Sequence, residues 1–199
     1  AWKILGAVLK QAGRKSEALD ANRKAVSLSP LDPEAHYNLG TTFKAVDRLE
    51  EAEKSFRQAI ALKPDFAEAY NNLGTTVQAL SRSEEAIKIY TNAIALKSDY
   101  TQAYYNLGIV LKERFRPEEA ETNFRYAISL RPDFAEAHNG LGAVLNELGR
   151  LDEAEVSYRH AIMLRSDYAE AHCNLGTTLK MLGKLDEAKV SFRKAITFE

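Results

Sequence analysis

Asparagine side chains recur along the chain at a spacing that would align hydrogen-bonding groups. Asn38, Asn72 and Asn106 lie 34 residues apart, and Asn174 follows in the same register. Each amide offers a donor and an acceptor, so a ladder of them can bind the backbone of an extended peptide without reading its sequence. Asparagine within a helix costs about 0.5–0.7 kcal/mol relative to alanine, so another interaction should offset that cost. We interpret the ladder as peptide-binding; the alternatives are hydrogen bonds between repeats or inheritance through duplication.

The same register brings further polar side chains beside the ladder. Tyrosine or asparagine precedes it by one residue, and threonine follows it by three. The candidate peptide-binding residues are Asn38, Asn72, Asn106, Asn174, Tyr37, Asn71, Tyr105, Thr41, Thr75 and Thr177. The ladder is interrupted at Ile4 and at Gly140, where Asn139 lies one position early.

The chain contains no recognisable catalytic or metal-binding pattern. A glycine-rich phosphate loop, a nucleophile elbow and an HExxH motif are all absent from the sequence. His36, His138 and His172 recur whole periods apart, which indicates a packing position instead of a shared metal. We expect no catalytic residues, no cofactor and no metal.

A 34-residue period without insertions organises the whole sequence. Glycine marks it at Gly6, Gly40, Gly74, Gly108, Gly142 and Gly176, and alanine at Ala18, Ala52, Ala86, Ala120, Ala154 and Ala188. We number the columns of the repeat from Pro33, so these glycines occupy column 8 and these alanines column 20. Columns 4, 7, 8 and 11 and columns 20, 24, 27 and 28 each have the rhythm of an amphipathic helix, so each repeat predicts two helices.

Residue types at the helix ends support that division. Glycine at column 15, in Gly13, Gly149 and Gly183, predicts a left-handed cap after the first helix, and Pro117 predicts the start of a second helix. Pro30, Pro64 and Pro132 would follow the end of a second helix. Acidic capping boxes beginning at Asp65, Asp133 and Asp167 predict N-caps for the following first helices.

Small residues at columns 8, 20 and 27 would let the helix backbones approach closely. The larger residues at columns 4 and 24 would fill the remaining space, and column 24 is aromatic in Phe56, Tyr90, Phe124, Tyr158 and Phe192. Ala120→Leu should therefore destabilise the fold by about 1–3 kcal/mol.

These columns resemble the tetratricopeptide repeat (TPR). The match is carried by Trp2-x2-Leu5-Gly6, Ala52-x3-Phe56, Ala59 and Pro64, and it extends over all 199 residues. The resemblance implies an all-α fold, a right-handed superhelical α-solenoid of six helix-turn-helix units whose first helices line a concave groove. We predict one array, with units 1–32, 33–66, 67–100, 101–134, 135–168 and 169–199.

The asparagine ladder is similar to that of the superhelical arm of O-linked N-acetylglucosamine transferases, which contacts substrate backbones. The resemblance favours a scaffold that binds a protein or an extended peptide. The alternatives are the substrate-docking arm of a larger glycosyltransferase of that kind and a module that self-associates end to end through uncapped terminal repeats. Chaperone-adaptor members of the family bind a C-terminal carboxylate through basic residues on their first helices. Columns 2, 5 and 6 here contain only one basic residue, Lys3, which predicts weak binding of an acidic C-terminal peptide.

Composition narrows the partners further. Lysine and arginine number 27 against 28 acidic residues, which argues against nucleic acid held by its phosphates. No apolar run reaches the roughly 18 residues of a membrane span, so we expect no membrane partner. The single cysteine, Cys173, favours a reducing compartment, and we expect a cytoplasmic location.

Overall fold

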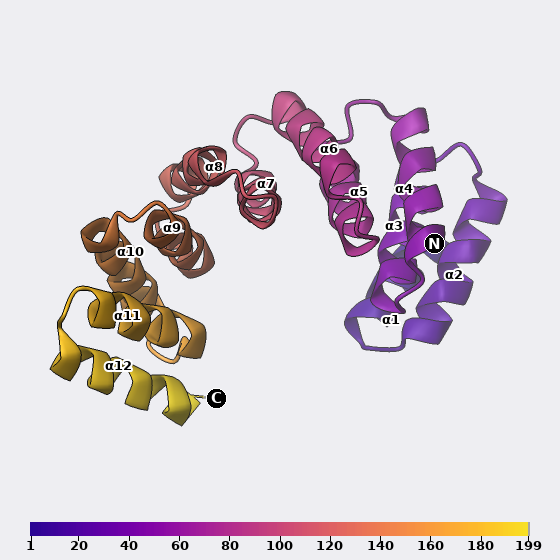
Figure 1. Ribbon diagram of the computed structural model, residues 1–199. Coiled ribbons are helices and arrows are strands. Elements are labelled where there is room, and N and C mark those ends of the chain that lie inside the picture. Colours follow the sequence, from indigo (N-terminus) through magenta and orange to yellow (C-terminus); the bar gives the residue numbers. More distant parts are fainter. Residues whose placement is uncertain (199) are drawn as a thin grey trace. The chain divides into compact units, whose positions relative to one another are not determined.

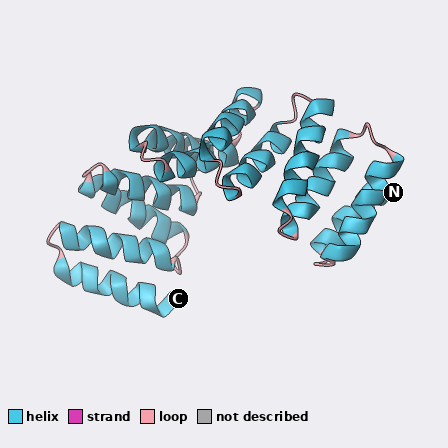
Figure 2. Ribbon diagram, turned by 45° about the vertical axis from the view of Figure 1, so that its right-hand side comes forward, coloured by secondary structure: helices cyan, strands magenta, loops and turns pink. Residues whose placement is uncertain are grey.

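The computed structural model describes residues 1–198, and twelve α-helices form within them. Short loops join successive helices into antiparallel pairs (Figure 2). The helices are α1 (Trp2–Gln11), α2 (Lys15–Leu28), α3 (Pro33–Ala45), α4 (Leu49–Leu62), α5 (Ala67–Ala79), α6 (Ser83–Leu96), α7 (Thr101–Glu113), α8 (Pro117–Leu130), α9 (Ala135–Glu147), α10 (Leu151–Leu164), α11 (Ala169–Met181) and α12 (Leu185–Phe198). Each predicted repeat thus contains a first and a second helix, which confirms the all-α assignment.

The helices form two compact units, Ala1–Ser98 with α1 to α6 and Asp99–Glu199 with α7 to α12. Within each unit three helix pairs follow one another, labelled in order in Figure 1. The second helix of one pair contacts the first helix of the next, as in α2 with α3 and α4 with α5. Successive first helices also touch, so each unit is a continuous stack.

The predicted packing of small against large residues is present in the core. Ala52 and Ala120 are fully buried, as are Phe56, Tyr90 and Phe124 at column 24. A methyl group added to Gly40 would lie only 2.8 Å from Cε1 of Phe56. The glycine therefore allows the aromatic ring to pack directly against the backbone of the first helix.

The turn between the two helices of a repeat requires a left-handed residue. Gly13, Gly149 and Gly183 have φ of 74°, 74° and 77°, which confirms their predicted role. In the remaining repeats column 15 holds Asp47, Ser81 and Phe115, and their φ values of 59°, 62° and 56° give the same turn without glycine.

The capping boxes predicted at Asp65, Asp133 and Asp167 are wrong. The following helices begin two residues later, at Ala67, Ala135 and Ala169, with an aromatic N-cap residue and no side-chain cap bond. The physical reason at Asp65 and Asp133 is that the following aromatic residue packs inward, as the burial of Phe66 and Phe134 shows, so the helix starts beyond it. Tyr168, which follows Asp167, is partly buried and is the N-cap residue in the same way. Asp32 does cap α3: its Oδ1 accepts the backbone N–H groups of Glu34 and Ala35.

Closed rings of alternating charge join successive second helices. Between α4 and α6, Arg57 pairs with Glu53 and Glu85 at 2.7 and 2.5 Å, and Arg82 pairs with the same two carboxylates at 2.8 and 2.5 Å. Arg125, Arg150, Glu121 and Glu153 form the equivalent ring between α8 and α10. No helix within residues 1–198 combines the length and apolar character needed to cross a membrane.

Candidate functional site

Residues at columns 2, 5, 6, 9, 12 and 13 form one face of each first helix, which we call the first-helix surface. On α3 its polar members are Glu34, Tyr37, Asn38, Thr41 and Lys44. They recur one helical turn apart because α-helical residues three and four positions apart are neighbours on the surface. The candidate residues of the sequence analysis all belong to this face.

Asn72 on α5 bonds to the preceding repeat. Its Nδ2 donates to the hydroxyl of Tyr37 at 2.9 Å and to the backbone carbonyl of Glu68 at 3.1 Å. Both N–H groups of the amide are thus used within the protein, and Oδ1 remains as an acceptor.

Asn38 differs from Asn72 in its neighbour from the preceding repeat. Column 5 of the preceding repeat holds Lys3 for Asn38, whereas it holds Tyr37 for Asn72. Lys3 binds Asp32 and Glu34 at 2.7 and 2.8 Å. Among the described contacts the Asn38 side chain has no hydrogen bond, although its backbone carbonyl accepts from Thr41 and Thr42. Asn38 is partly exposed, so its complete amide can bind an external backbone.

In the second unit the ladder is joined by Asn139. Asn174 Nδ2 donates to Asn139 Oδ1 at 3.1 Å, and Asn139 Nδ2 donates to the Tyr168 hydroxyl and to Glu170 at 3.3 and 3.1 Å. Asn106 Oδ1 accepts from Gln102 at 3.0 Å. Asn139 is buried, and its hydrogen bonds position the side chains of Asn174 and Glu170 on this surface. Its position at column 5, beside Gly140, was the sequence signal that placed it on this surface, although it was not among the candidate binding residues.

The candidate tyrosines are part of the packing between repeats. The rings of Tyr37 and Phe66 lie 4.9 Å apart, and those of Tyr105 and Phe134 lie 4.7 Å apart. Burial raises the pKa of Tyr37, and burial with neighbouring charges raises the pKa of Tyr105 to about 12. Both therefore present neutral hydroxyl groups at neutral pH. Asn71, the remaining column-5 candidate, is buried.

Threonine and lysine side chains connect successive first helices. Thr41 Oγ1 donates to the carbonyl of Asn38 and accepts from Lys10 Nζ at 3.3 Å. One repeat later Thr75 Oγ1 donates to the carbonyl of Asn72 and accepts from Lys44 Nζ at 2.5 Å. Thr177 is exposed and donates to the carbonyl of Cys173.

Three of the four acidic residues at column 2 have basic partners. Glu34 pairs with Lys3, Glu68 with Lys97 at 3.3 Å and Glu136 with Arg165 at 2.7 Å. These pairs largely compensate the negative charge along this edge of the surface.

The histidines at column 4 hold the turn before each first helix. Nε2 of His36, His138 and His172 lies 2.8, 2.9 and 3.0 Å from the carbonyl six residues earlier. A carbonyl only accepts, so Nε2 is the donor in each case. No cluster of three or more potential metal ligands occurs within residues 1–198.

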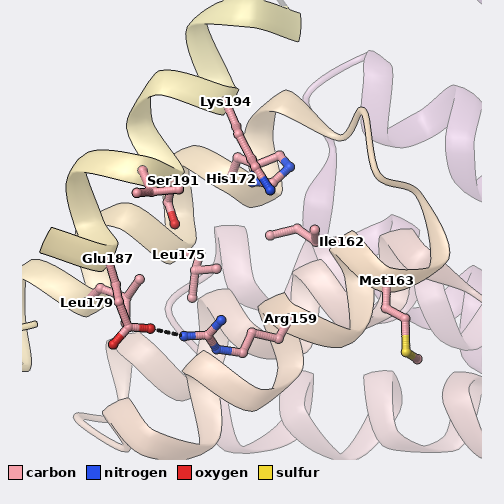
Figure 3. Close-up of a pocket in the computed structure, with 10 residues that line it drawn as sticks. Arg159, Ile162, Met163, His172, Leu175, Leu179, Glu187, Ser191 and Lys194 are labelled. Atoms are coloured by element: carbon pink, nitrogen blue, oxygen red, sulfur yellow. Dashed lines mark hydrogen bonds and ion pairs between the residues drawn. The ribbon is translucent and has the colours of Figure 1, made fainter.

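A pocket of about 370 Å³ lies among α10, α11 and α12 (Figure 3). Ile162, Leu175 and Leu179 line it, as do Arg159 and Glu187, which form an ion pair at 2.6 Å between α10 and α12. One repeat earlier, Ile128, Leu141 and His138 line a pocket of about 330 Å³ at corresponding columns. The hollow is thus a recurring product of repeat packing, and it lies apart from the candidate residues.

Family comparisons agree with the repeat pattern. Models of the tetratricopeptide repeat match residues 33–66, 65–133 and 133–198. No curated protein matches the chain.

Solved structures share the fold. YrrB, described as a TPR protein with an unusual peptide-binding site, is 25% identical, with a TM-score of 0.76 over 91% of this chain and 93% of YrrB. PilF of Pseudomonas aeruginosa is 22% identical, with a TM-score of 0.86 over 96% of this chain and 87% of that one. MamA of Desulfovibrio magneticus RS-1 is 17% identical, with a TM-score of 0.77 over 83% and 94%.

Proposed function

Because the chain belongs to the tetratricopeptide repeat family, we propose that its first-helix surface binds an extended polypeptide. Proteins of this family generally mediate protein–protein interactions. The peptide-binding site named for YrrB, a structural relative at 25% identity, favours a peptide as the partner. The proposed role is binding and not catalysis, and the same binding would serve either a scaffold or the docking arm of a larger enzyme.

The observation that carries the proposal is the free amide of Asn38. A partly exposed asparagine in mid-helix, with no side-chain bond to any residue in 1–198, has an uncompensated cost of about 0.5–0.7 kcal/mol relative to alanine. The amide can offset this cost by donating a hydrogen bond to one backbone carbonyl of a bound chain and accepting one from a backbone N–H of that chain.

The remaining candidates contribute unequally to that binding. Asn72 contributes its Oδ1 as an acceptor, because its donors are used by Tyr37 and Glu68. Tyr37 and Tyr105 support the first-helix surface of their own units through aromatic contacts, and exposed Thr177 belongs to the first-helix surface of the second unit. The roles of Asn106, Asn174, Asn71, Thr41 and Thr75 in binding stay predictions, as do the single six-unit array, end-to-end self-association and the cytoplasmic location.

The test is a selection of displayed random peptides on the full chain, followed by fluorescence anisotropy with the enriched peptides. Asn38→Ala should raise Kd by about fivefold to twentyfold, the equivalent of one to two hydrogen bonds. Asn92→Ala is the matched control, since Asn92 is exposed on the second helix α6. The Asn38 substitution should leave helix content unchanged, because alanine is the better helix former.

Two results would contradict the proposal. One is that no peptide is enriched above background. The other is that Asn38→Ala and Asn92→Ala leave the affinity equally unchanged.

A further inference from the structure

The charges of the first-helix surface in the unit Ala1–Ser98 are unevenly compensated. Glu34 and Glu68 each pair with a lysine of the same unit. Lys10 and Lys44, at column 12, have only threonine hydroxyls as partners in the described contacts. The lysines of this surface that lack a carboxylate partner among the described residues thus lie together, at the C-terminal ends of α1 and α3.

The two ammonium groups are held in equivalent positions. Lys10 Nζ binds Thr41 Oγ1, which is fixed by its own bond to the Asn38 carbonyl. Lys44 Nζ binds Thr75 Oγ1, which is fixed in the same way by the Asn72 carbonyl. An ammonium group has three donors, so each lysine keeps donors for an anion after bonding to its threonine.

Lys44 also bears a desolvation cost. Burial lowers the pKa of Lys44, and no nearby carboxylate opposes that effect. The C-terminal ends of α1 and α3 favour a basic residue through the helix dipole, which explains the residue type. The dipole leaves the spare ammonium donors unused, whereas an external carboxylate would bind them and compensate the charge.

The spacing of the lysines limits the shape of the partner. The first helices α1 and α3 touch. Packed helices are about 8–10 Å apart, so we expect equivalent atoms of these adjacent repeats to be separated by roughly that distance. A polyproline II helix rises about 3.1 Å per residue with three residues per turn, so side chains three residues apart lie about 9.3 Å apart on one side. In a β-strand, side chains three residues apart point to opposite faces, and those two apart are only about 6.8 Å apart.

We propose that this unit selects an extended segment of polyproline II conformation that places acidic side chains, three residues apart, on Lys10 and Lys44. The inference rests on the proposed function and specifies its ligand. It concerns internal acidic side chains, so it is compatible with the predicted weak binding of a C-terminal carboxylate. Asn38 lies on α3 with Lys44, and Asn72 lies on α5 with Thr75, the threonine that Lys44 binds. Both asparagines would contact the backbone of that segment.

Anisotropy titrations with synthetic peptides test the inference on the full chain. The probe is a fluorescent proline-rich peptide with two glutamates three residues apart, blocked at both ends to remove terminal charges. Comparison peptides carry glutamine at both positions or glutamates two residues apart. The first peptide should bind at least about fivefold more tightly than either comparison peptide.

Protein variants locate the effect. Lys10→Gln and Lys44→Gln should each weaken binding of the glutamate peptide by about fivefold to tenfold, because a charge-assisted hydrogen bond is lost. Glutamine keeps a long side chain with an amide donor for the threonine. Lys88→Gln on α6 removes the same charge from an exposed second-helix position and should leave Kd unchanged.

The outcomes separate this inference from the proposed function. Equal affinity for the glutamate and glutamine peptides, or equal affinity for the two glutamate spacings, would overturn the inference while peptide binding itself remained. Equal weakening by Lys88→Gln and Lys44→Gln would also overturn it, because the attraction would then be general. If none of the peptides binds, the inference fails, and the random-peptide selection decides whether the proposed function fails with it.

Discussion

Gly40→Ala tests the close packing of the first helix α3 against the second helix α4. Alanine is the better helix former by about 0.8–1.0 kcal/mol, so an unobstructed helical site would gain stability. At Gly40 the new methyl would lie 2.8 and 2.9 Å from two atoms of Phe56, about 0.6 Å inside ordinary contact at 3.4 Å. Phe56 is fully buried, and its ring has no flexible end that can move aside.

The clash should outweigh the gain in helix propensity. Overpacking costs typically about 1–3 kcal/mol, and the buried ring places this site in the upper half of that range. The net expected loss is therefore about 1–2 kcal/mol. For a chain of this length that lowers Tm by roughly 2–8 °C.

Thermal unfolding followed by circular dichroism measures the change, and a second substitution identifies its cause. Phe56→Leu removes the ring that meets the methyl, so the cost of Gly40→Ala should shrink by about 1 kcal/mol or more in that background. An unchanged or raised Tm for Gly40→Ala alone would refute the packing argument. The same cost in both backgrounds would refute the assignment to Phe56.

Three further predictions concern other parts of the fold. Ala120→Leu should lower the free energy of unfolding by about 1–3 kcal/mol, because Ala120 is fully buried; urea titration measures it. Asn22→Leu should raise Tm by about 2–4 °C, because Asn22 is buried with an unpartnered Oδ1 at a column that is otherwise aromatic. Burial raises the pKa of Glu121, but bonds from Arg125 and Arg150 outweigh it and hold that pKa below its usual value. The charge ring around Glu121 should therefore stabilise the fold above about pH 4.3, and this stabilisation should be lost as pH falls through the lowered pKa. On acidification the free energy of unfolding of the wild type should fall by up to about 1 kcal/mol more than that of Glu121→Gln.

The fold was largely predictable because each packing position recurs, with a similar residue type, in several repeats. Gly40 and Phe56 have counterparts in most repeats, so their columns identify them as facing helix positions. The residues at which the first helices begin were harder to predict from the sequence. Asp65 fits a capping box, yet inward packing of Phe66 moves the helix start to Ala67, and a local motif cannot report that tertiary contact.

The candidate surface was predictable in position but only partly in role. Periodicity placed Asn38 and Asn72 on one face, but it could not distinguish a free amide from a bonded one. That difference depends on the column-5 residue of the preceding repeat, which is Lys3 for Asn38 and Tyr37 for Asn72. The inter-repeat bond considered as the alternative thus exists at Asn72, while the Asn38 side chain has no hydrogen bond among the described residues.

The most direct test of the proposed function is to locate a bound peptide by photo-crosslinking. A peptide enriched on the full chain would carry a benzophenone group, and mass spectrometry would identify the crosslinked residues. We predict crosslinks on the first helices, including the neighbourhood of Asn38 and Thr75, and their loss in Asn38→Ala at limiting peptide concentration. Crosslinks confined to second helices such as α4 and α6 would contradict binding at the first-helix surface.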